Sequence, residues 1–290
     1  MLRSWHLGKL FGIDVYIHWT FLLLILFVMM GQIDGGIPAA VLSAALIIAT
    51  FGCVLLHEVG HALMARRFGI PTLDITLYPI GGVARLTRLG EKPMEEFWIA
   101  VAGPAVNVAI AALLGVFMVL SGKPFAPNPS LQSLLHPGDD VIRALQCANI
   151  LLVLFNMLPA FPMDGGRVLR SLLSTELGRL RATEIAAKLG TVFALIFGIG
   201  GIFYWHNAIL ALIGGFAYLA GQQELAMVRQ IEYNRRAPPL DVLPAGSEII
   251  DVMPVAIDAN FSGVTWDTRT RTWTVWKNGQ PVQSRAHDAF

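Results

Sequence analysis

The sequence predicts an all-α polytopic membrane protein with about six transmembrane helices, a β-hairpin between the second and third helices, and a small β-rich C-terminal tail. Composition is the first reason: of the 290 residues, 55% are hydrophobic and 14% are charged, with a mean hydropathy of +0.60. A typical soluble domain is about one quarter charged. The second reason is that apolar runs close to the ~20 residues of a spanning helix recur along the chain.

The apolar runs end before residue 230. They cover residues 17–33, 38–65, 97–121, 141–162, 188–205 and 207–226. No small-x-small cleavage site follows the first run, so we interpret it as a retained span and not as a signal peptide. The last two runs are so close together that they predict a tight helical hairpin. We therefore expect a transmembrane domain over 1–230 and a small cytoplasmic tail over 238–290.

The distribution of positive charge predicts the orientation in the membrane. Lysine and arginine residues gather before the first span, between the second and third, between the fourth and fifth, and after the sixth. The positive-inside rule makes these segments cytoplasmic. We expect an integral multi-pass protein in the lipid bilayer of the cell membrane, with both termini in the cytoplasm. The net charge of +1 argues against a nucleic-acid partner.

Two short stretches between the second and third spans alternate between apolar and polar residues. They are Leu73–Tyr78 and Val83–Thr87, and the turn signal Pro79–Gly82 between them predicts a β-hairpin. In the tail, Thr268–Lys277 alternates and Asn278-Gly279 favours a hairpin turn. The three tail tryptophans predict the core of a small β unit, and the weaker interpretation is a surface for a regulatory partner.

The segment His57-Glu58-Val59-Gly60-His61 carries the strongest chemical signal. Residues four apart on a helix share a face, so two imidazoles there can bind one Zn²⁺. The metal makes water a nucleophile at neutral pH, and the intervening carboxylate can serve as general base. The motif lies in an apolar run, where an acid at mid-membrane costs ~2.5–3.5 kcal/mol. A bound metal explains that cost, and a polar helix–helix contact is the alternative.

A catalytic zinc usually has three protein ligands, so a third ligand is needed. Asp164 is the candidate, because it follows Pro159 and Pro162, which must break the fourth span near its cytoplasmic end. Broken backbone at membrane depth is tolerated where it lines a cavity. The alternative is an Asp-Gly turn in which Asp164 caps an amphipathic helix over Gly165–Leu177.

These residues resemble the site-2 protease family of intramembrane zinc metalloproteases. Besides the His-Glu-x-x-His helix, the resemblance rests on Asn156–Arg167, Gly81–Ala84, Ala102–Asn107 and His18–Thr20. The segment His18–Thr20 in the first expected span resembles the corresponding segment of the six-span branch of the family, which has no PDZ domain. Many members of that branch end in paired nucleotide-binding domains. The tail is too short for such a pair, so we expect no nucleotide site.

The resemblance implies a function and a set of site residues. His57, His61 and Asp164 would hold one zinc ion per chain, and Glu58 would be the catalytic base. Asn156 would hydrogen-bond the substrate or the developing oxyanion. The hairpin would present a strand edge to an unwound substrate, which would be a transmembrane segment of another protein. Cleavage would be a step of regulated intramembrane proteolysis.

Other interpretations remain open at this point. One is a membrane-anchored zinc protease whose site faces water, although such enzymes usually take the third ligand from a helix glutamate. Another is a non-catalytic metal-binding membrane scaffold or transporter, which would not need Glu58. Among single residues, we expect Cys53 to be a packing residue and His18 an interfacial one. Asn107 is expected to satisfy backbone groups freed by Pro104.

Overall fold

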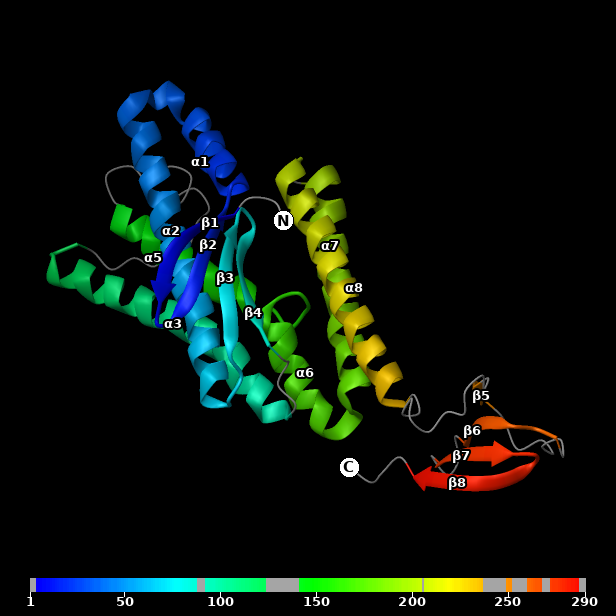
Figure 1. The fold of residues 1–290 in the computed structure, drawn as a ribbon. Helices are drawn as coiled ribbons and strands as arrows, with labels where there is room; N and C mark the ends of the chain where they lie inside the picture. The colour runs from blue at the N-terminus through cyan, green and yellow to red at the C-terminus, as the bar shows by residue number, and fades with distance from the viewer. Residues whose placement is uncertain are drawn as a thin grey trace. The chain divides into compact units, whose positions relative to one another are not determined.

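The computed structural model describes residues 4–87, 92–123, 141–204, 206–236, 249–251, 260–267 and 272–286 (Figure 1). The chain divides into two compact units, Met1–Leu225 and Ala226–Phe290, which are described separately. The division falls inside the last long helix, upstream of the boundary that the sequence suggested.

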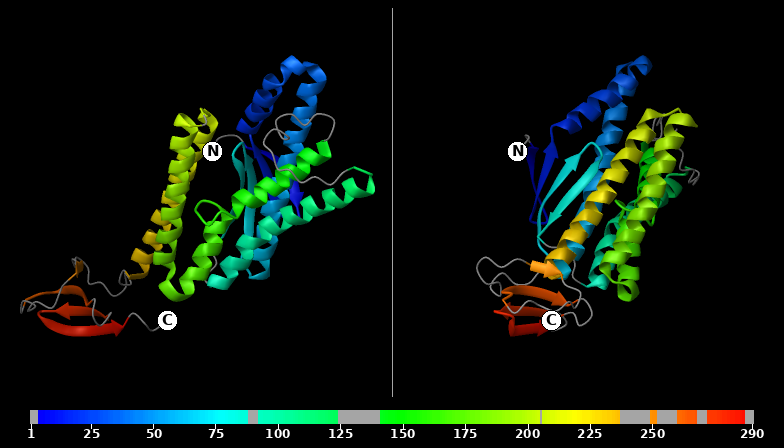
Figure 2. Two further views of the ribbon diagram at one scale, coloured as in Figure 1. Left: turned by 180° about the vertical axis from the view of Figure 1, so that it is seen from behind. Right: turned by 90° about the vertical axis from the view of Figure 1, so that its right-hand side faces the viewer.

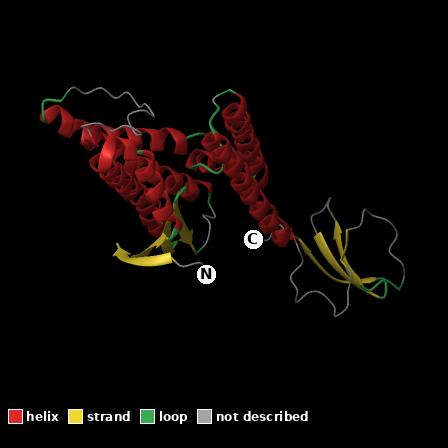
Figure 3. Cartoon of the chain, turned by 90° about the horizontal axis from the view of Figure 1, so that it is seen from above, coloured by secondary structure: helices red, strands yellow, loops and turns green. Residues whose placement is uncertain are grey.

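The first unit is mostly helical (Figure 3). Its helices are α1 (Thr20–Gly31), η1 (Ile33–Gly35), α2 (Gly36–Arg67), α3 (Pro93–Leu120), α5 (Val141–Asn156), α6 (Asp164–Leu177), α7 (Arg179–Phe203) and the first part of α8 (Ala208–Arg236). Among the described residues, three helices are long and apolar enough to cross a membrane: Ile33–Arg67, Pro93–Leu120 and Arg179–Phe203. Helices α1 and α5 are apolar but shorter. Several apolar helices therefore support a membrane protein.

A four-stranded sheet in this unit corrects the all-α expectation. Its strands are β1 (Ser4–Leu10), β2 (Ile13–His18), β3 (Thr72–Tyr78) and β4 (Gly81–Leu86), in the order β1-β2-β3-β4. The β1–β2 and β3–β4 pairs are antiparallel, and β2–β3 is parallel. Within this unit, the sequence predicts strands only in the stretch that forms β3 and β4.

The first apolar run is also shorter as a helix than expected. Ile17 and His18 belong to β2, in which Ile13–Tyr16 alternates between buried and partly exposed side chains as a strand does. Helix α1 keeps 12 residues. At ~1.5 Å per residue its length is roughly 18 Å, less than the ~30 Å hydrocarbon core of a bilayer.

The sheet packs on the C-terminal half of α2. Ile13 of β2 and Ile75 of β3 form a buried apolar cluster with Val59 and Ala62 of α2, and Figures 1 and 2 show the strands running along this helix. On another side of α2, a Cβ at Gly60 would lie 2.8 Å from the carbonyl oxygen of Ala102 in α3. The glycine therefore permits a close approach of α2 to α3.

The helical path is broken between α5 and α6, as the two prolines predicted. Helix α5 ends at Asn156, and α6 begins at Asp164. The broken segment folds back onto the start of α6, where a Cβ at Gly165 would lie 2.5 Å from the carbonyl oxygen of Met157 and one at Gly166 would lie 2.8 Å from that of Ala160. The Gly165-Gly166 pair thus permits this fold-back and sets the position of Asp164.

Helices α7 and α8 pack against one another as a helical hairpin, which the short connection between them predicted. A Cβ at Gly201 of α7 would lie 2.8 Å from the backbone nitrogen of Ala211 in α8. One at Gly214 of α8 would lie 2.6 Å from the carbonyl oxygen of Ala194 in α7. These glycines allow the two helix backbones to approach one another.

The second unit contains a small four-stranded sheet. Its strands are β5 (Ile249–Asp251), β6 (Gly263–Asp267), β7 (Thr272–Lys277) and β8 (Gln280–Ala286), in that order. Asn278 and Gly279 both have positive φ in the β7–β8 turn, the conformation that Asn-Gly favours. The rings of Trp266 and Trp273 lie 4.6 Å apart, and Trp276 Nε1 donates a hydrogen bond to Thr265 Oγ1 at 2.7 Å.

Candidate metal centre

The two histidines of the motif lie one turn apart on α2. His57 and His61 are both buried, and their Nε2 atoms are 3.0 Å apart. Helix α2 ends at Arg67, six positions after His61. The ring pair is therefore close to one end of an apolar helix long enough to cross a membrane.

Asp164 completes a triangle with the histidines. Its Oδ2 atom lies 3.1 Å from His57 Nε2 and 3.1 Å from His61 Nε2. The three side chains are buried and form a group able to hold a metal ion. The capping alternative is not observed, because α6 begins after Met163 without a side-chain cap and the Asp164 carboxylate faces the histidines.

The hydrogen bonds of the two Nδ1 atoms determine the tautomer of each histidine and therefore whether its Nε2 atom has a lone pair for a metal ion. His57 Nδ1 donates to Asn107 Oδ1 at 2.5 Å, and His61 Nδ1 donates to the carbonyl oxygen of Ile99 at 2.6 Å. Both partners only accept, so the neutral rings carry their protons on Nδ1 and lone pairs on Nε2. Such partners orient metal-binding histidines in many proteins.

This donor set fits a small cation. Two nitrogen lone pairs and one carboxylate oxygen converge at 3.0–3.1 Å, an arrangement that is repulsive without positive charge between them. Tetrahedral zinc with ligands at ~2.0–2.1 Å holds those ligands roughly 3.3 Å apart. The observed spacing is close to that value, and two imidazoles with one carboxylate are common zinc ligands.

Helix α3 supplies the surroundings of the histidines. A Cβ at Gly103 would lie 2.5 Å from His61 Cε1 and 2.7 Å from His57 Nε2, so only a glycine leaves room for both rings. Asn107 is completely buried, and its Nδ2 donates to Asn149 Oδ1 at 2.8 Å. The expectation for Asn107 therefore needs a correction: its amide holds a site histidine and connects it to α5.

A cavity of about 570 Å³ opens beside the triangle. Glu58, Asn156 and Arg167 line it together with residues 81–84 of strand β4. A Cβ at Gly82 would lie 2.5 Å from Glu58 Cγ, so the strand packs directly on the glutamate side chain. The cavity therefore combines the donor triangle, a carboxylate, an amide and an edge strand.

Comparison with known proteins agrees with this geometry. Residues 45–147 and 139–197 match the model of peptidase family M50, and these ranges contain His57, Glu58, His61, Asn156 and Asp164. The chain belongs to peptidase family M50. This family M50 chain is 36% identical over 229 residues to a zinc metalloprotease of Methanocaldococcus jannaschii, an alignment that covers 79% of this chain and 62% of the relative.

A solved structure is similar as well. The site-2 protease from Methanocaldococcus jannaschii aligns with a TM-score of 0.57 and 35% identity, over 77% of this chain and 95% of that one. The alignment thus spans 62% of the length of the curated relative and 95% of the chain in the solved structure. The family resemblance noted in the sequence is confirmed.

Two further candidates lie outside the donor triangle of this M50 chain. Cys53 is buried and receives a hydrogen bond from Asn149 Nδ2 at 3.3 Å, which agrees with a packing role. His18 ends β2, lies 2.7 Å from Thr20 Oγ1 and packs its ring 5.1 Å from that of Tyr78. Neither residue joins the donor group.

Sequence reasoning assigned no role to three groups in the site. They are the carbonyl of Ile99, the Gly103 contact and Arg167, which lines the cavity. A backbone carbonyl leaves no signal in residue type. Asn107 did leave one, because a fully buried amide in an apolar helix needs a hydrogen-bond partner.

Proposed function

We propose that this protein is a zinc-dependent intramembrane metalloprotease that hydrolyses a peptide bond in or near a transmembrane segment of a membrane protein. The observation that carries the proposal is the buried triangle of two imidazole nitrogens and one carboxylate oxygen beside Glu58 on an apolar spanning helix. The zinc metalloprotease and site-2 protease names of the similar proteins support it.

Each site residue has a role in this reaction. His57, His61 and Asp164 would hold one Zn²⁺, which would act as a Lewis acid toward the scissile carbonyl and water. Glu58 takes the proton from the attacking water and passes it to the leaving amine. Asn156 donates a hydrogen bond from its amide to the oxyanion that develops on the carbonyl oxygen. Glu58 and Asn156 line the same cavity, as these roles require.

The free edge of β4 is suited to hold the substrate in an extended form. Strand β4 is the last strand of the sheet, and residues 81–84 line the cavity. Peptide bonds in a helix are shielded by their own hydrogen bonds, whereas a segment added to a strand edge exposes alternate groups. The substrate would therefore unwind locally and pair with β4 before cleavage.

The membrane arrangement extends what the apolar helices support. We assign the six expected spans to α1, α2, α3, α5, α7 and α8; α1, with 12 residues, would cross the bilayer only together with the residues that flank it. Both termini would lie in the cytoplasm, and the protein would lie in the cell membrane. Apolar helices and the arginines that flank them support this arrangement. The tail over 238–290 would be a separate cytoplasmic unit that binds a regulatory partner.

The test is cleavage of a single-span model substrate by the purified full chain in detergent. Cleavage should require zinc and should fall by ~10²–10⁴-fold in Glu58→Gln, because general base catalysis typically contributes that much. Zinc should remain bound to the variant. Glu176→Gln makes the same change at an exposed position of α6 and should cut normally. Near-normal turnover by zinc-loaded Glu58→Gln would refute the base, and zinc binding without any cleavage would favour a metal-binding scaffold.

A further inference from the structure

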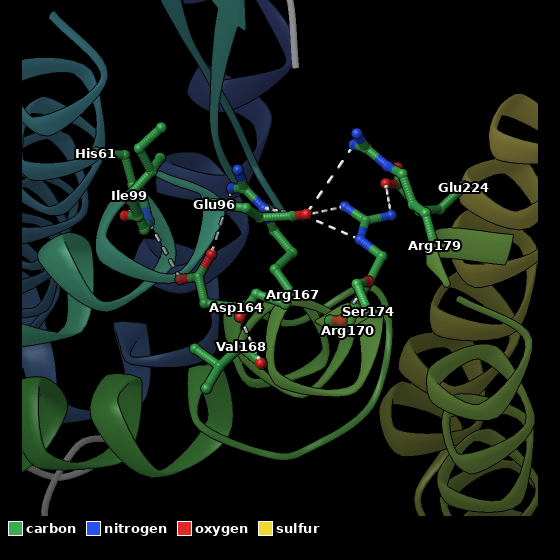
Figure 4. A network of polar contacts seen from close by, with 11 residues as sticks. His61, Glu96, Ile99, Asp164, Arg167, Val168, Arg170, Ser174, Arg179 and Glu224 are labelled. Atoms are coloured by element: carbon green, nitrogen blue, oxygen red, sulfur yellow. Dashed lines mark hydrogen bonds and ion pairs between the residues drawn. The ribbon is translucent and has the colours of Figure 1, made fainter. Parts of the chain in front are cut away.

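A buried carboxylate on the first turns of α3 gathers three arginines (Figure 4). Glu96 Oε1 accepts hydrogen bonds from Arg170 Nε at 2.9 Å and from Arg170 Nη2, and it lies 4.0 Å from Arg167 Nε. Glu96 Oε2 lies 3.9 Å from Arg179 Nη2. Glu96 is therefore the shared anion of three cations that come from α6 and α7.

Arg170 is the centre of this cluster. Its side chain is completely buried, and its Nη1 donates to Glu224 Oε1 of α8 at 2.6 Å. Burial opposes the charged form of Arg170, but the carboxylates of Glu96 and Glu224 hold its pKa above the usual range. A buried charge of this kind depends on its carboxylate partners, and Glu96 accepts two of the hydrogen bonds from Arg170 whereas Glu224 accepts one. The cluster thus fixes α6 firmly against α3.

The same part of α3 touches both elements that supply the donor triangle. Ile99, one turn after Glu96, accepts the hydrogen bond from His61 Nδ1. Asp164, Arg167 and Arg170 follow one another at intervals of three residues on α6, so they share a face. Figure 4 shows Asp164 between His61 and the arginine cluster. The distance between Asp164 and the histidines therefore depends on how α3 holds α6.

Arg167 connects the cluster to the triangle. Its Nη1 atom lies 3.8 Å from Asp164 Oδ1, while Asp164 Oδ2 faces both histidines. In the described part of the chain, Asp164 and Glu96 are the two carboxylates within ion-pair distance of Arg167. Without Glu96, the guanidinium would have Asp164 alone and would compete with a metal ion for it.

We propose that Glu96 is a positioning residue of the metal centre. It holds Arg170 and thereby α6, and it shares Arg167 so that the Asp164 carboxylate stays available to the metal. It also offsets arginine charge beside a site for a dication. The inference rests on the metal-binding part of the proposed function and does not require that the protein cut a substrate.

The test measures metal affinity in the full chain purified in detergent. Competition with a chromophoric chelator gives the Kd for Zn²⁺, and the absorption bands of bound Co²⁺ report the ligand geometry. Glu96→Gln should weaken zinc binding by ~10–100-fold, the usual effect of losing a group that orients a metal ligand. The Co²⁺ bands should change as well. An unchanged Kd with unchanged bands would overturn the proposal.

A second substitution separates positioning from general stability. If Arg167 competes for Asp164 in Glu96→Gln, then the double variant Glu96→Gln/Arg167→Gln should bind zinc more tightly than Glu96→Gln alone. A structural defect would instead be additive or worse, because independent losses add. A double variant that binds no more tightly than Glu96→Gln would therefore overturn the proposal.

Glu224→Gln is the matched control. It removes the other carboxylate of Arg170 but leaves Arg167 with Glu96, so its zinc Kd and Co²⁺ bands should stay as in the wild type. An equal loss of zinc affinity in Glu224→Gln would reject a specific role for Glu96.

If Glu96→Gln does not fold, Glu96→Asp is the alternative variant, because it withdraws the carboxylate while keeping its charge. The zinc affinity of Glu96→Asp should also fall, and it should recover when Arg167→Gln is added. If the affinity of Glu96→Asp neither falls nor responds to Arg167→Gln, the proposal is overturned.

The readouts distinguish this inference from the proposed protease activity. A wild-type chain that binds zinc without cutting would refute the protease and leave the Kd comparisons intact. Normal cleavage with an unchanged Kd in Glu96→Gln would refute the role of Glu96 and leave the protease intact.

Discussion

Gly103→Ala should damage the metal centre without removing any ligand. The added Cβ would lie 2.5 Å from His61 Cε1 and 2.7 Å from His57 Nε2. Non-bonded heavy atoms settle at roughly 3.5 Å, so ring atoms must move by about 1 Å. The rings cannot move freely, because Asn107 and the carbonyl of Ile99 hold their Nδ1 atoms.

The size of the effect follows from the tolerance of metal sites. Ligand distances are expected within about 0.2 Å of their normal values, several-fold less than the required movement. Misplacement by ~1 Å near reacting groups can cost on the order of 10²-fold in rate. We therefore expect Gly103→Ala to lose at least about tenfold in zinc affinity and about 10²-fold in kcat/KM. Both losses have the same origin, so they should appear together.

The assay combines metal content after dialysis, zinc Kd by chelator competition and cleavage of the model substrate. Gly52→Ala is the matched control, because a Cβ at Gly52 of α2 meets nothing within 4 Å. It should keep both zinc affinity and activity. Wild-type zinc affinity and activity in a folded Gly103→Ala protein would show that the rings adapt, and would refute the argument from close packing.

Two further predictions concern the third ligand and the strand edge. Asp164→Asn should lower zinc content and activity together, because it removes a charged donor 3.1 Å from both histidine Nε2 atoms; full zinc occupancy in this variant would contradict the ligand assignment. In β4, successive backbone N–H groups point alternately toward β3 and outward. One of the variants Val83→Pro and Ala84→Pro therefore removes an outward N–H group. That variant should keep the wild-type melting temperature but have a lower kcat/KM. An unchanged kcat/KM in both variants would exclude pairing of substrate with this edge.

Much of the site could be predicted because its signals are local. Two histidines four residues apart on a helix must share a face, whatever the rest of the fold does. An acid and two imidazoles in an apolar helix also demand a partner. The prolines around residue 160 required a break, and α5 does end at Asn156 before α6 begins at Asp164.

The first hundred residues show where local signals fall short. The run beginning at Ile17 predicts a spanning helix, but β2 extends to His18 and leaves α1 with 12 residues. Strand β2 pairs in parallel with β3, which follows the whole of α2 in the chain. Such pairing depends on contacts far apart in sequence, so an alternating stretch of six residues does not reveal it.

The sequence by itself determined the class of protein, the paired histidines with Glu58, and the break that carries Asp164. These follow from composition, helical periodicity and the backbone chemistry of proline. Only the tertiary structure decided what surrounds them: the carbonyl of Ile99 on His61, the contact of Gly103 with both rings, and Glu96 among its arginines. The physical reason is that these groups act through position, because a backbone carbonyl, an absent side chain and a buried ion pair acquire their roles only when α3 packs against α2 and α6.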